Sequence, residues 1–292
     1  MLGRLTYKRN VTRLELSRGG ENVSLDPEKI ELSKELIGSG ATSRVFRGKF
    51  HHSEGAFTEI ACKEYMTTIT PKHKRKLFKE IECLKKLRHP NIVSHFGVDF
   101  TRSLVITELL EKKMTIDGEV ETIHNARELL DLHEMQPLPW ILRLKILKEV
   151  CCGLDFLHNN GIIHCDLKAG NIFIGENGNG GYVAKLGDFG TARFDFEQFS
   201  VSVLPSTADD QSLMCTAAYT APELLARGSK PSRKSDIYSL GMIMAEFSLP
   251  NRSTPWEGEV INSSMIYDFV SKGERPTITE EDLLGLDSNV AR

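Results

Sequence analysis

The sequence predicts an α+β chain in which most of the strands come first and most of the helices follow. Between residues 30 and 110, short apolar or alternating runs are separated by glycine-containing turns, as in IELSKELIGSGATSRVFRGKF. Two later segments, 138–158 and 235–247, repeat apolar residues at helical spacing. Strands gathered in one part of a chain and helices in another are typical of α+β proteins.

The composition is that of an ordinary folded protein. The 292 residues are 40% hydrophobic and 26% charged, so the chain can bury a substantial core and does not belong to the disordered class. A net charge of −3 indicates no basic surface, and we therefore expect no nucleic-acid partner.

The cysteines and the apolar runs indicate the cellular compartment. The N-terminal stretch MLGRLTYKRNVTRLELS lacks the apolar core of a secretory signal, and no apolar run approaches the ~18 residues of a membrane span. We therefore expect a soluble cytoplasmic protein without a membrane span. Free thiols in a reducing compartment agree with this, because the cysteines show neither zinc-site spacing nor a disulfide framework; they are Cys62, Cys83, Cys151, Cys152, Cys165 and Cys215.

The first predicted strands surround a glycine turn. Residues 1–29 alternate weakly, and we expect a flanking segment with one or two short strands. Segment 30–50 predicts strand, turn and strand, with Gly38 and Gly40 in the turn. Glycines at such a turn let backbone amides close over phosphates, but a plain hairpin explains a single G-x-G equally well.

A further strand and an amphipathic helix follow. The strand EIACKEY places Ala61 and Lys63 on one face by its two-residue period. Taken alone, such a lysine is most simply a solvated one. Segment 72–93 predicts a helix that ends before Pro90, and its apolar side carries Leu77, Ile81, Leu84 and Leu87.

The middle of the chain continues with a buried strand at 103–110. Residues 112–122 predict an inserted loop to which we assign no function, and a short helix is expected over 126–133. The two long helices at 138–158 and 235–247 come next, and a surface helix ending at Gly273 follows them. The positions expected to face inward are Leu144, Leu147, Cys151 and Leu154 in the first long helix, and Ile237, Leu240, Met244 and Phe247 in the second.

The stretch 163–190 concentrates the residues that suit a chemical reaction. Asp166 and Asp188 lie in short loops on either side of an apolar run and a Gly/Asn turn, and Lys168 and Asn171 lie between them. Phosphoryl transfer requires a carboxylate for the proton of the incoming hydroxyl, a lysine near the moving phosphoryl group, and Asn and Asp oxygens for a divalent metal. All four kinds of group are present in this stretch.

The order H-C-D-L-K-A-G-N and then D-F-G resembles the catalytic and metal-binding loops of eukaryotic protein kinases. The resemblance covers residues 30–280 and implies a bilobal protein kinase fold, with a small antiparallel-sheet N-lobe that carries one regulatory helix and a larger, mainly helical C-lobe. It places the N-lobe and hinge at 30–110 and an incomplete C-lobe at 111–292, because family members continue through further helices. The motifs G-A-T-S-R-V-F, H-P-N-I-V and G-E-R-P are most similar to the tyrosine-kinase-like group of mostly Ser/Thr kinases.

The resemblance implies a role for each polar residue of this stretch. Asp166 would orient the substrate hydroxyl, Lys168 would offset charge on the γ-phosphate, and Asn171 and Asp188 would bind Mg²⁺. Thr216, where Ser/Thr kinases carry a threonine, together with Lys168 favours Ser/Thr specificity.

The resemblance also implies an ATP site between the lobes. Lys63, paired with Glu80 of the regulatory helix, would position the α- and β-phosphates, and Gly38 and Gly40 would cover them. Thr107 would be the gatekeeper that leaves a pocket open behind the adenine. The other expected ATP contacts are Ile37, Val45, Ala61, Glu108 and Leu110 of the N-lobe and hinge, and Phe173 beneath the adenine.

Several residues are expected to support the fold instead. The resemblance implies that Asp236 anchors the catalytic loop and that His164 serves packing and backbone bonds. Cys151 and His95 are most simply core residues, although His95 stands where the family usually has an apolar side chain.

Two further features depart from the family pattern. Cys165 replaces the arginine that usually binds a phosphorylated activation-segment residue, and a cysteine cannot form that charge-assisted pair. We therefore expect activity that does not depend on such a phosphate. Glu223 of the A-P-E motif lacks a recognisable arginine partner, so it must stay solvated, find another cation or leave this lobe weak.

The function expected from these residues is Mg·ATP-dependent phosphorylation of Ser/Thr hydroxyls in protein substrates, in intracellular signalling. The alternative is a pseudokinase or scaffold that uses the fold to bind partners. A kinase of small molecules is disfavoured, because A-P-E and the Thr216 loop serve peptide substrates in the family. The sequence does not identify a regulatory partner.

Overall fold

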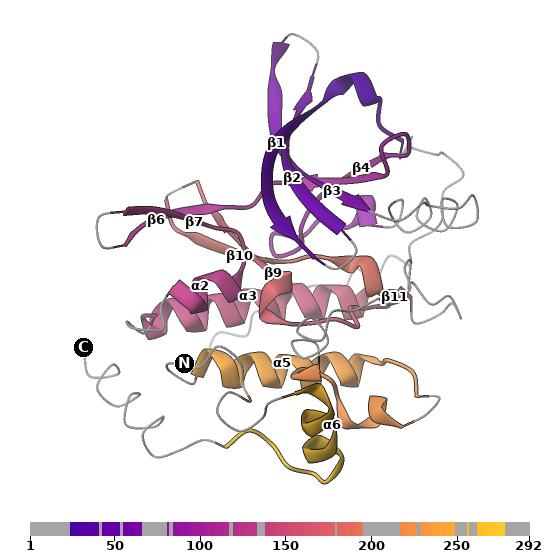
Figure 1. The fold of residues 1–292 in the computed structure, drawn as a ribbon, viewed down its shortest axis with the longest axis vertical. Coiled ribbons are helices and arrows are strands. Elements are labelled where there is room, and N and C mark those ends of the chain that lie inside the picture. The colour runs from indigo at the N-terminus through magenta and orange to yellow at the C-terminus, as the bar shows by residue number, and fades with distance from the viewer. Residues whose placement is uncertain are drawn as a thin grey trace, which may run out of the picture.

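The computed structural model describes residues 24–40, 43–52, 55–65, 81, 84–116, 119–132, 138–178, 180–194, 217–226, 229–248, 256 and 262–277. A sheet forms the upper part of the molecule and helices form the lower part, with the polar loops of 163–190 between them (Figure 1). The expected α+β fold with a sheet-containing N-lobe and a helical C-lobe is therefore confirmed.

The N-lobe is built on a five-stranded antiparallel sheet of order β1-β2-β3-β5-β4. Its apolar residues form a small core of Ile30, Ile60, Cys62, Leu104 and Ile106, all at most 4% exposed. The predicted strands at 30–50, 59–65 and 103–110 are all present. The strands are β1 (Ile30–Ser39), β2 (Ser43–His51), β3 (Phe57–Tyr65), β4 (His95–Asp99) and β5 (Leu104–Glu108).

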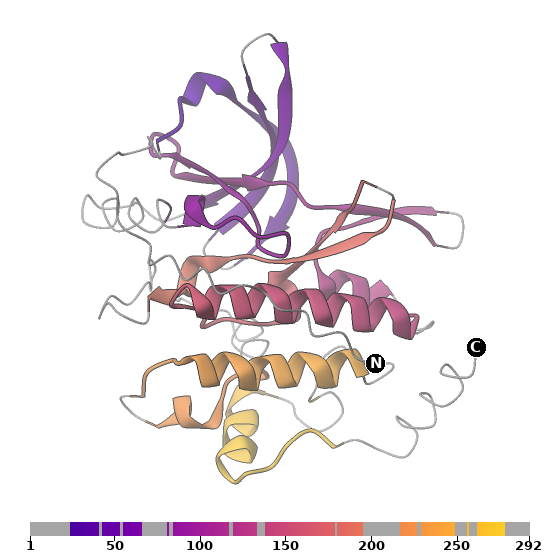
Figure 2. The same ribbon diagram turned by 180° about the vertical axis from the view of Figure 1, so that it is seen from behind.

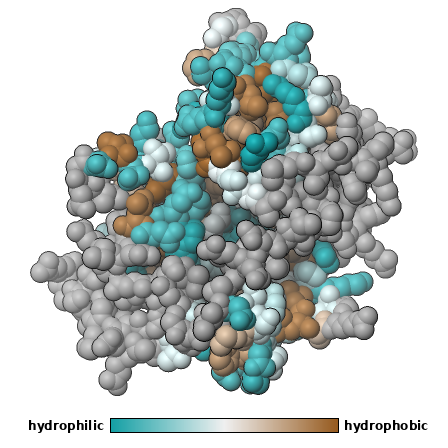
Figure 3. Space-filling view, viewed as in Figure 1, coloured by the Kyte–Doolittle hydropathy of each residue, from teal (hydrophilic) through white to brown (hydrophobic). Residues whose placement is uncertain are grey.

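Hydrophobic side chains also remain on the outside of this sheet. Leu36 of β1 and Phe57 of β3 are about half exposed. In the orientation of Figure 1, brown residues gather in the upper part of the molecule over these strands (Figure 3). Burial of the sheet by the described residues is therefore incomplete on this side.

Of the flanking segment 1–29, the structure describes residues 24–29. Ser24 forms a parallel bridge with Val98, and the Leu25 N–H donates to the Val98 carbonyl over 2.9 Å. A 3-10 turn over Pro27–Lys29 follows, capped by the Asp26 side chain. These residues extend the edge of the sheet beside β4.

Of the predicted helix at 72–93, only the last turn falls within the described residues. Ile81 and residues 84–86 are helical, and Ile81, Leu84 and Leu87 are each at most 6% exposed. Leu77 lies outside the described residues. The inward side predicted for this helix is thus confirmed at three of its four positions.

The inserted segment is a β-hairpin, and the prediction of a loop over 112–122 was wrong. Strands β6 (Lys112–Ile116) and β7 (Glu119–Ile123) pair antiparallel. At its base, the Lys112 ammonium donates to the Gly180 carbonyl at 2.8 Å, and the Tyr182 hydroxyl contacts the Met114 sulfur at 3.4 Å. Both strands are short and mostly polar, so their apolar residues do not alternate clearly enough for the sequence to indicate a hairpin.

The C-lobe consists of helices that pack side by side below the site, with α3 and α5 running along each other in both views (Figure 2). Small two-stranded sheets carry the polar loops above them. The helices are α2 (Ala126–Leu132), α3 (Trp140–Asn159), α5 (Arg233–Ser248) and α6 (Ser263–Ser271), and the strands are β8 (Ile162–Ile163), β9 (Ile172–Glu176), β10 (Tyr182–Leu186) and β11 (Arg193–Phe194).

The inward faces of the two long helices differ in part from the prediction. Leu147, Leu154, Leu240 and Phe247 are buried as expected, and Cys151 is half-buried against the core. The predictions for Leu144, Ile237 and Met244 were wrong, because these side chains are 57%, 54% and 38% exposed.

The reason for this difference is that polar side chains occupy part of each buried face. On α3 the Arg143 guanidinium is buried and donates to the carbonyls of Leu138 and Phe247 at 2.8 and 2.6 Å. On α5 the carboxylates of Asp236 and Glu246 are buried. The spacing of apolar residues alone therefore does not identify the buried side of either helix correctly.

Candidate active site

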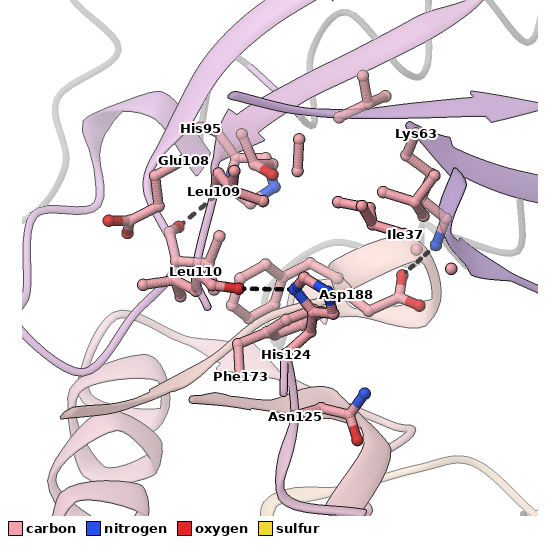
Figure 4. Close-up of a pocket in the computed structure, with 18 of the residues that line it drawn as sticks. Ile37, Lys63, His95, Glu108, Leu109, Leu110, His124, Asn125, Phe173 and Asp188 are labelled. Atoms are coloured by element: carbon pink, nitrogen blue, oxygen red, sulfur yellow. Dashed lines mark hydrogen bonds and ion pairs between the residues drawn. The ribbon is translucent and has the colours of Figure 1, made fainter. Parts of the chain in front are cut away.

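A cavity of about 320 Å³ lies between the sheet, the segment that links the lobes and the loops of the C-lobe (Figure 4). Gly40 is not among its lining residues, and Glu80 lies outside the described residues. The cavity is lined by ten of the residues predicted from sequence: Ile37, Gly38, Val45, Ala61, Lys63, Thr107, Glu108, Leu110, Phe173 and Asp188.

The glycine turn and β3 form one wall of the cavity. Gly38 pairs with Val45 across β1 and β2, and the Gly40 N–H donates to the Ser43 carbonyl over 2.9 Å. Ala61 and Lys63, two residues apart on β3, both face the cavity, while Cys62 between them is fully buried. The predicted alternation along β3 is confirmed.

Lys63 and Asp188 form an ion pair at one end of the cavity, with Nζ and Oδ1 2.6 Å apart (Figure 4). Burial opposes both charges, but each partner outweighs it for the other. The pKa of Lys63 is therefore above its ordinary value, and Lys63 lowers the pKa of Asp188 to about 2. A charged lysine thus faces the cavity, held by a carboxylate 125 residues away in the chain.

The backbone brings Asp188 close to the sheet. Asp188 has left-handed dihedral angles, with φ 56° and ψ 65°. A Cβ on the preceding Gly187 would lie 2.7 Å from Val93 Cγ2 and 2.8 Å from Phe173 Cε2. Only a residue without a side chain allows this approach.

The catalytic loop gathers Asp166, Lys168 and Asn171. The Lys168 ammonium donates to Asp166 Oδ2 over 2.8 Å, and the Asn171 amide donates to the Asp166 carbonyl and to Oδ2 over 2.7 and 3.1 Å. The Gly187 N–H donates to the Asn171 carbonyl at 3.1 Å, which joins this loop to the one that carries Asp188. The four polar residues predicted from sequence are therefore brought together.

Asp236 of α5 holds the catalytic loop from below. Its carboxylate, 1% exposed, accepts the backbone N–H groups of His164 and Cys165 at 2.8 and 3.0 Å. It also lies 2.8 Å from His158 Nε2 of α3. These bonds support the left-handed conformation of Cys165, whose φ is 67°.

Two histidine rings contact the Phe189 ring from opposite lobes. The His95 and His164 rings lie 5.6 and 5.3 Å from it, measured between centroids. His164 is fully buried and its Nε2 lies 3.0 Å from the Gly187 carbonyl, so it serves packing and backbone bonds as expected. His95 is 6% exposed, and burial lowers its pKa to about 4.

The segment that joins the lobes has one backbone donor without a described acceptor. Among the described residues, no acceptor takes the Leu110 N–H, while the Leu110 carbonyl lies 3.2 Å from His124 Nδ1. The Glu108 carboxylate binds Lys185 through both oxygens at 2.8 Å and the Ser94 N–H at 2.7 Å. The Glu108 N–H donates to the Ser94 carbonyl at 3.0 Å.

Sequence reasoning missed the side of the cavity formed by His124, Asn125 and Glu128. The Asn125 side chain accepts the Glu128 N–H at 3.0 Å, and the Glu128 carboxylate accepts the His124 N–H at 2.7 Å. This is a reciprocal helix cap at the start of α2. The N-x-x-E spacing before a predicted helix was the signal that could have located it.

The comparison with known families agrees with this geometry. Residues 32–282 match the family described as protein kinase domain. This chain belongs to the protein kinase family.

Several similar proteins are longer than this chain. Similar proteins include U-box domain-containing protein 34 of Arabidopsis thaliana, 31% identical over 75% of this chain and 24% of that protein. MDIS1-interacting receptor like kinase 2 of the same plant is 29% identical over 73% of this chain and 19% of that protein. A probable serine/threonine-protein kinase of Dictyostelium discoideum is 29% identical over 78% of this chain and 39% of that protein. The chain thus spans well under half of the length of these relatives.

Membership of the family implies ATP, a divalent metal and protein substrates, and the residues of the kinase site fit the first two. Within the described residues there is no cluster of three or more His, Cys, Asp or Glu side chains that could hold a metal alone. Asp188 and the Asn171 side-chain oxygen, which no protein donor occupies in the described part of the chain, are hard oxygen ligands. Two protein ligand groups suit a metal that shares its coordination with phosphates and water.

The expected activation segment is mostly outside the described residues. Thr216 and the polar stretch 195–215 are not described. Glu223 is exposed and makes no ion pair with any described residue. This agrees with the expected alternative in which Glu223 stays solvated. Among the described helices, none is both long and apolar enough to cross a membrane.

Proposed function

We propose that this kinase domain transfers the γ-phosphoryl group of Mg·ATP to Ser/Thr hydroxyls of protein substrates in intracellular signalling. The observation that carries the proposal is the pair of charged groups at one end of the cavity. Lys63 and Asp188 are 2.6 Å apart, and Asp188 is joined through Gly187 and Asn171 to the loop that holds Asp166 and Lys168.

Each charged residue has a distinct role in this proposal. Lys63 binds the α- and β-phosphates, and Asn171 and Asp188 hold Mg²⁺, which supplies charge neutralisation when it is bound. Asp166 orients the substrate hydroxyl and accepts its proton, and Lys168 offsets charge on the transferred group. Because Lys168 and Asn171 already donate to Asp166, its carboxylate is oriented before substrate arrives.

The adenine is assigned to the apolar part of the same cavity. We propose that the free N–H of Leu110 and the carbonyl of Glu108 bind its edge. Val45 and Ala61 lie on the N-lobe side and Phe173 on the C-lobe side. Ile37, beside the glycine turn, and Thr107 of β5 also line the cavity.

Support for Ser/Thr specificity comes from Lys168 of the catalytic loop and from the names of relatives such as the Dictyostelium protein. The motifs around the glycine turn and H-P-N-I-V support the tyrosine-kinase-like group. A reducing intracellular compartment is supported by the free thiols of Cys62, Cys151, Cys152 and Cys165.

Independence from activation-segment phosphorylation is part of the proposal. Burial raises the pKa of the Cys165 thiol to about 12, so the side chain is neutral and offers a phosphate no counter-charge. We expect simultaneous alanine substitution of the five candidate acceptors to retain turnover. Loss of turnover in a folded variant would overturn this point; the acceptors are Ser200, Ser202, Ser206, Thr207 and Ser212.

The experiment measures transfer of radiolabelled phosphate from Mg·ATP to a generic protein substrate. Wild type is compared with Asp166→Asn and Lys63→Met. The matched controls are Asp155→Asn on the exposed side of α3 and Lys49→Met on β2, which repeat each chemical change away from the cavity. We expect both site variants to lose at least a hundredfold in rate and both controls to retain wild-type rates.

Other outcomes would support the alternatives. Folded wild type that binds ATP but transfers no phosphate would favour a scaffold over an enzyme. Phosphorylation of a small metabolite but not of peptides would favour a small-molecule kinase. Phosphorylation confined to tyrosine would reject the Ser/Thr assignment alone.

A further inference from the structure

The inserted hairpin of β6 and β7 projects from the side of the molecule in both views (Figure 1, Figure 2). Its base is anchored, because Ile123 is 1% exposed within the main core and the Lys112 ammonium pairs with Glu176 at 3.1 Å. β6 is the inner strand, since it lies against β9 and its Met114 sulfur contacts the Tyr182 hydroxyl. β7 is therefore the outer strand of an anchored hairpin.

Both faces of β7 are open to solvent along most of its length. Glu119, Val120, Glu121 and Thr122 are all exposed, and Val120 is 66% exposed. Because successive side chains of a strand point to opposite faces, the exposure of this run means that neither face of it is covered. Among the described strands, β7 pairs with β6 alone. Its outer edge thus offers backbone N–H and carbonyl groups to a further strand.

Charge alternates along this outer strand. Glu119 and Glu121 lie on one face, and Val120 lies on the other. Across the hairpin, β6 places Ile116 directly opposite Glu119 and Met114 directly opposite Glu121. Neither carboxylate therefore has a cation of β6 directly opposite it. A strand added on the open side can supply both cations.

We propose that β7 is a docking edge at which an extended segment of a protein partner adds as a third strand. The segment carries lysine or arginine at alternate positions, opposite Glu119 and Glu121, and an apolar residue opposite Val120. Main-chain hydrogen bonds along the edge supply affinity, and the alternating side chains supply specificity. None of the residues that line the cavity belongs to β6 or β7, so the proposal does not depend on the kinase reaction.

A second copy of this chain fits the edge poorly. An antiparallel pair of β7 strands centred on Val120 sets Glu119 opposite Glu121 of the second copy, and a pair centred on Glu121 sets the two Glu121 side chains opposite each other. Like charges directly opposite each other destabilise a sheet. A basic segment of another protein is therefore the better match to this edge.

The test uses a synthetic peptide of alternating lysine and valine residues as the probe. A second peptide has the same composition with its lysines and valines in separate blocks, and fluorescence anisotropy measures the binding of both to the whole chain. We expect the alternating peptide to bind about fivefold more tightly, because only this peptide places cations opposite both glutamates when it lies along β7. In Glu119→Gln/Glu121→Gln the preference should vanish. The matched control Glu31→Gln/Glu59→Gln, at exposed strand positions of the N-lobe, should keep it.

Charge reversal and backbone methylation give two further readouts. Glu119→Lys/Glu121→Lys should prefer a peptide of alternating glutamate and valine over the lysine–valine peptide. Only every second N–H of an added strand points toward its neighbour. N-methylation of one alternate set of peptide residues should therefore abolish binding, and N-methylation of the other set should leave it intact.

Far-UV circular dichroism of each variant verifies that it is folded. Equal affinity of the alternating and block peptides for wild type would overturn the proposal, as would a preference that survives in Glu119→Gln/Glu121→Gln. Equal effects of the two methylated sets would show that the peptide is not an added strand, which also overturns it. Self-association of wild type that blocks peptide binding would assign the edge to a second copy and overturn the proposal as well.

Discussion

At the scale of single residues, Gly187 determines how closely the loop that carries Asp188 approaches the sheet. We predict that Gly187→Ala lowers the free energy of unfolding by about 1–3 kcal/mol, because the new methyl group overlaps Val93 and Phe173. Since both neighbours line the cavity, nucleotide affinity should fall as well. Urea unfolding and ADP calorimetry measure the two effects.

The matched control for this prediction is Gly178→Ala. A Cβ at Gly178 meets nothing within 4 Å, so the same change should alter the free energy of unfolding by less than about 0.5 kcal/mol. An equal cost at both positions would mean that the close approach at Gly187 is not the cause.

His95 makes stability depend on pH with a definite sign. Its pKa falls from an ordinary value near 6.5 to about 4, so between these values the unfolded chain binds more protons than the folded one. The stabilisation is complete above pH 6.5 and is lost as the pH falls toward 4. At pH 5 the loss is about 2 kcal/mol.

The measurement is urea unfolding of wild type and His95→Phe at pH 7 and pH 5. The difference between the two proteins should shift by about 2 kcal/mol in favour of the variant at the lower pH. His52→Phe, at an exposed position, serves as the control and should track wild type. A parallel response of wild type and His95→Phe would contradict the buried, neutral ring.

At the scale of elements, Tyr219 and Glu246 connect the start of the segment 217–226 to α5. The Tyr219 hydroxyl donates to the Glu246 carboxylate at 2.8 Å, and Arg127 of α2 is an ion-pair partner of the same carboxylate. Burial raises the pKa of Glu246, and Arg127 and Tyr219 act against that rise. Three elements of the C-lobe are thus joined at one buried carboxyl group.

We predict that Tyr219→Phe lowers the free energy of unfolding by about 2 kcal/mol, because the buried carboxylate loses a donor. Tyr182→Phe is the matched control, since among the described residues the Tyr182 hydroxyl is bonded to the weak acceptor sulfur of Met114 alone. Chemical denaturation of wild type, Tyr219→Phe and Tyr182→Phe measures the free energy of unfolding of each. Similar costs for both variants would argue against a special role of the Glu246 contact.

At the scale of the whole molecule, an ion pair ties the hinge to the C-lobe. Glu108 at the end of β5 binds Lys185 of β10, and both side chains are at most 20% exposed. Lys185→Met leaves a mostly buried carboxylate with the Ser94 N–H as its remaining described donor. We predict a loss of about 1–3 kcal/mol in the free energy of unfolding, less than for a fully buried pair.

The control is Lys272→Met, which removes an exposed ion pair with Asp268 on α6 and should cost almost nothing. Adding Glu108→Gln to Lys185→Met should restore part of the loss, because the unpaired charge is removed. Thermal or urea unfolding of wild type, the two single lysine variants and the double variant measures these differences in stability. No recovery in the double variant would indicate that packing of the lysine stem, and not charge, explains the loss.

The sequence alone determined the features that depend on local pattern and residue chemistry. The alternation of EIACKEY placed Ala61 and Lys63 on one face, and the order of Asp166, Lys168, Asn171 and Asp188 indicated phosphoryl transfer. These inferences need only a repeat of two along a strand or the known chemistry of a motif.

The tertiary structure decided what depends on contacts between distant segments. The hairpin at 112–123, the exposure of Leu144 and Met244, and the partners of Asp236 and Glu246 all follow from which surfaces meet. A helix with apolar residues on several sides does not specify which side is buried, and buried polar groups appear only when their partners are known.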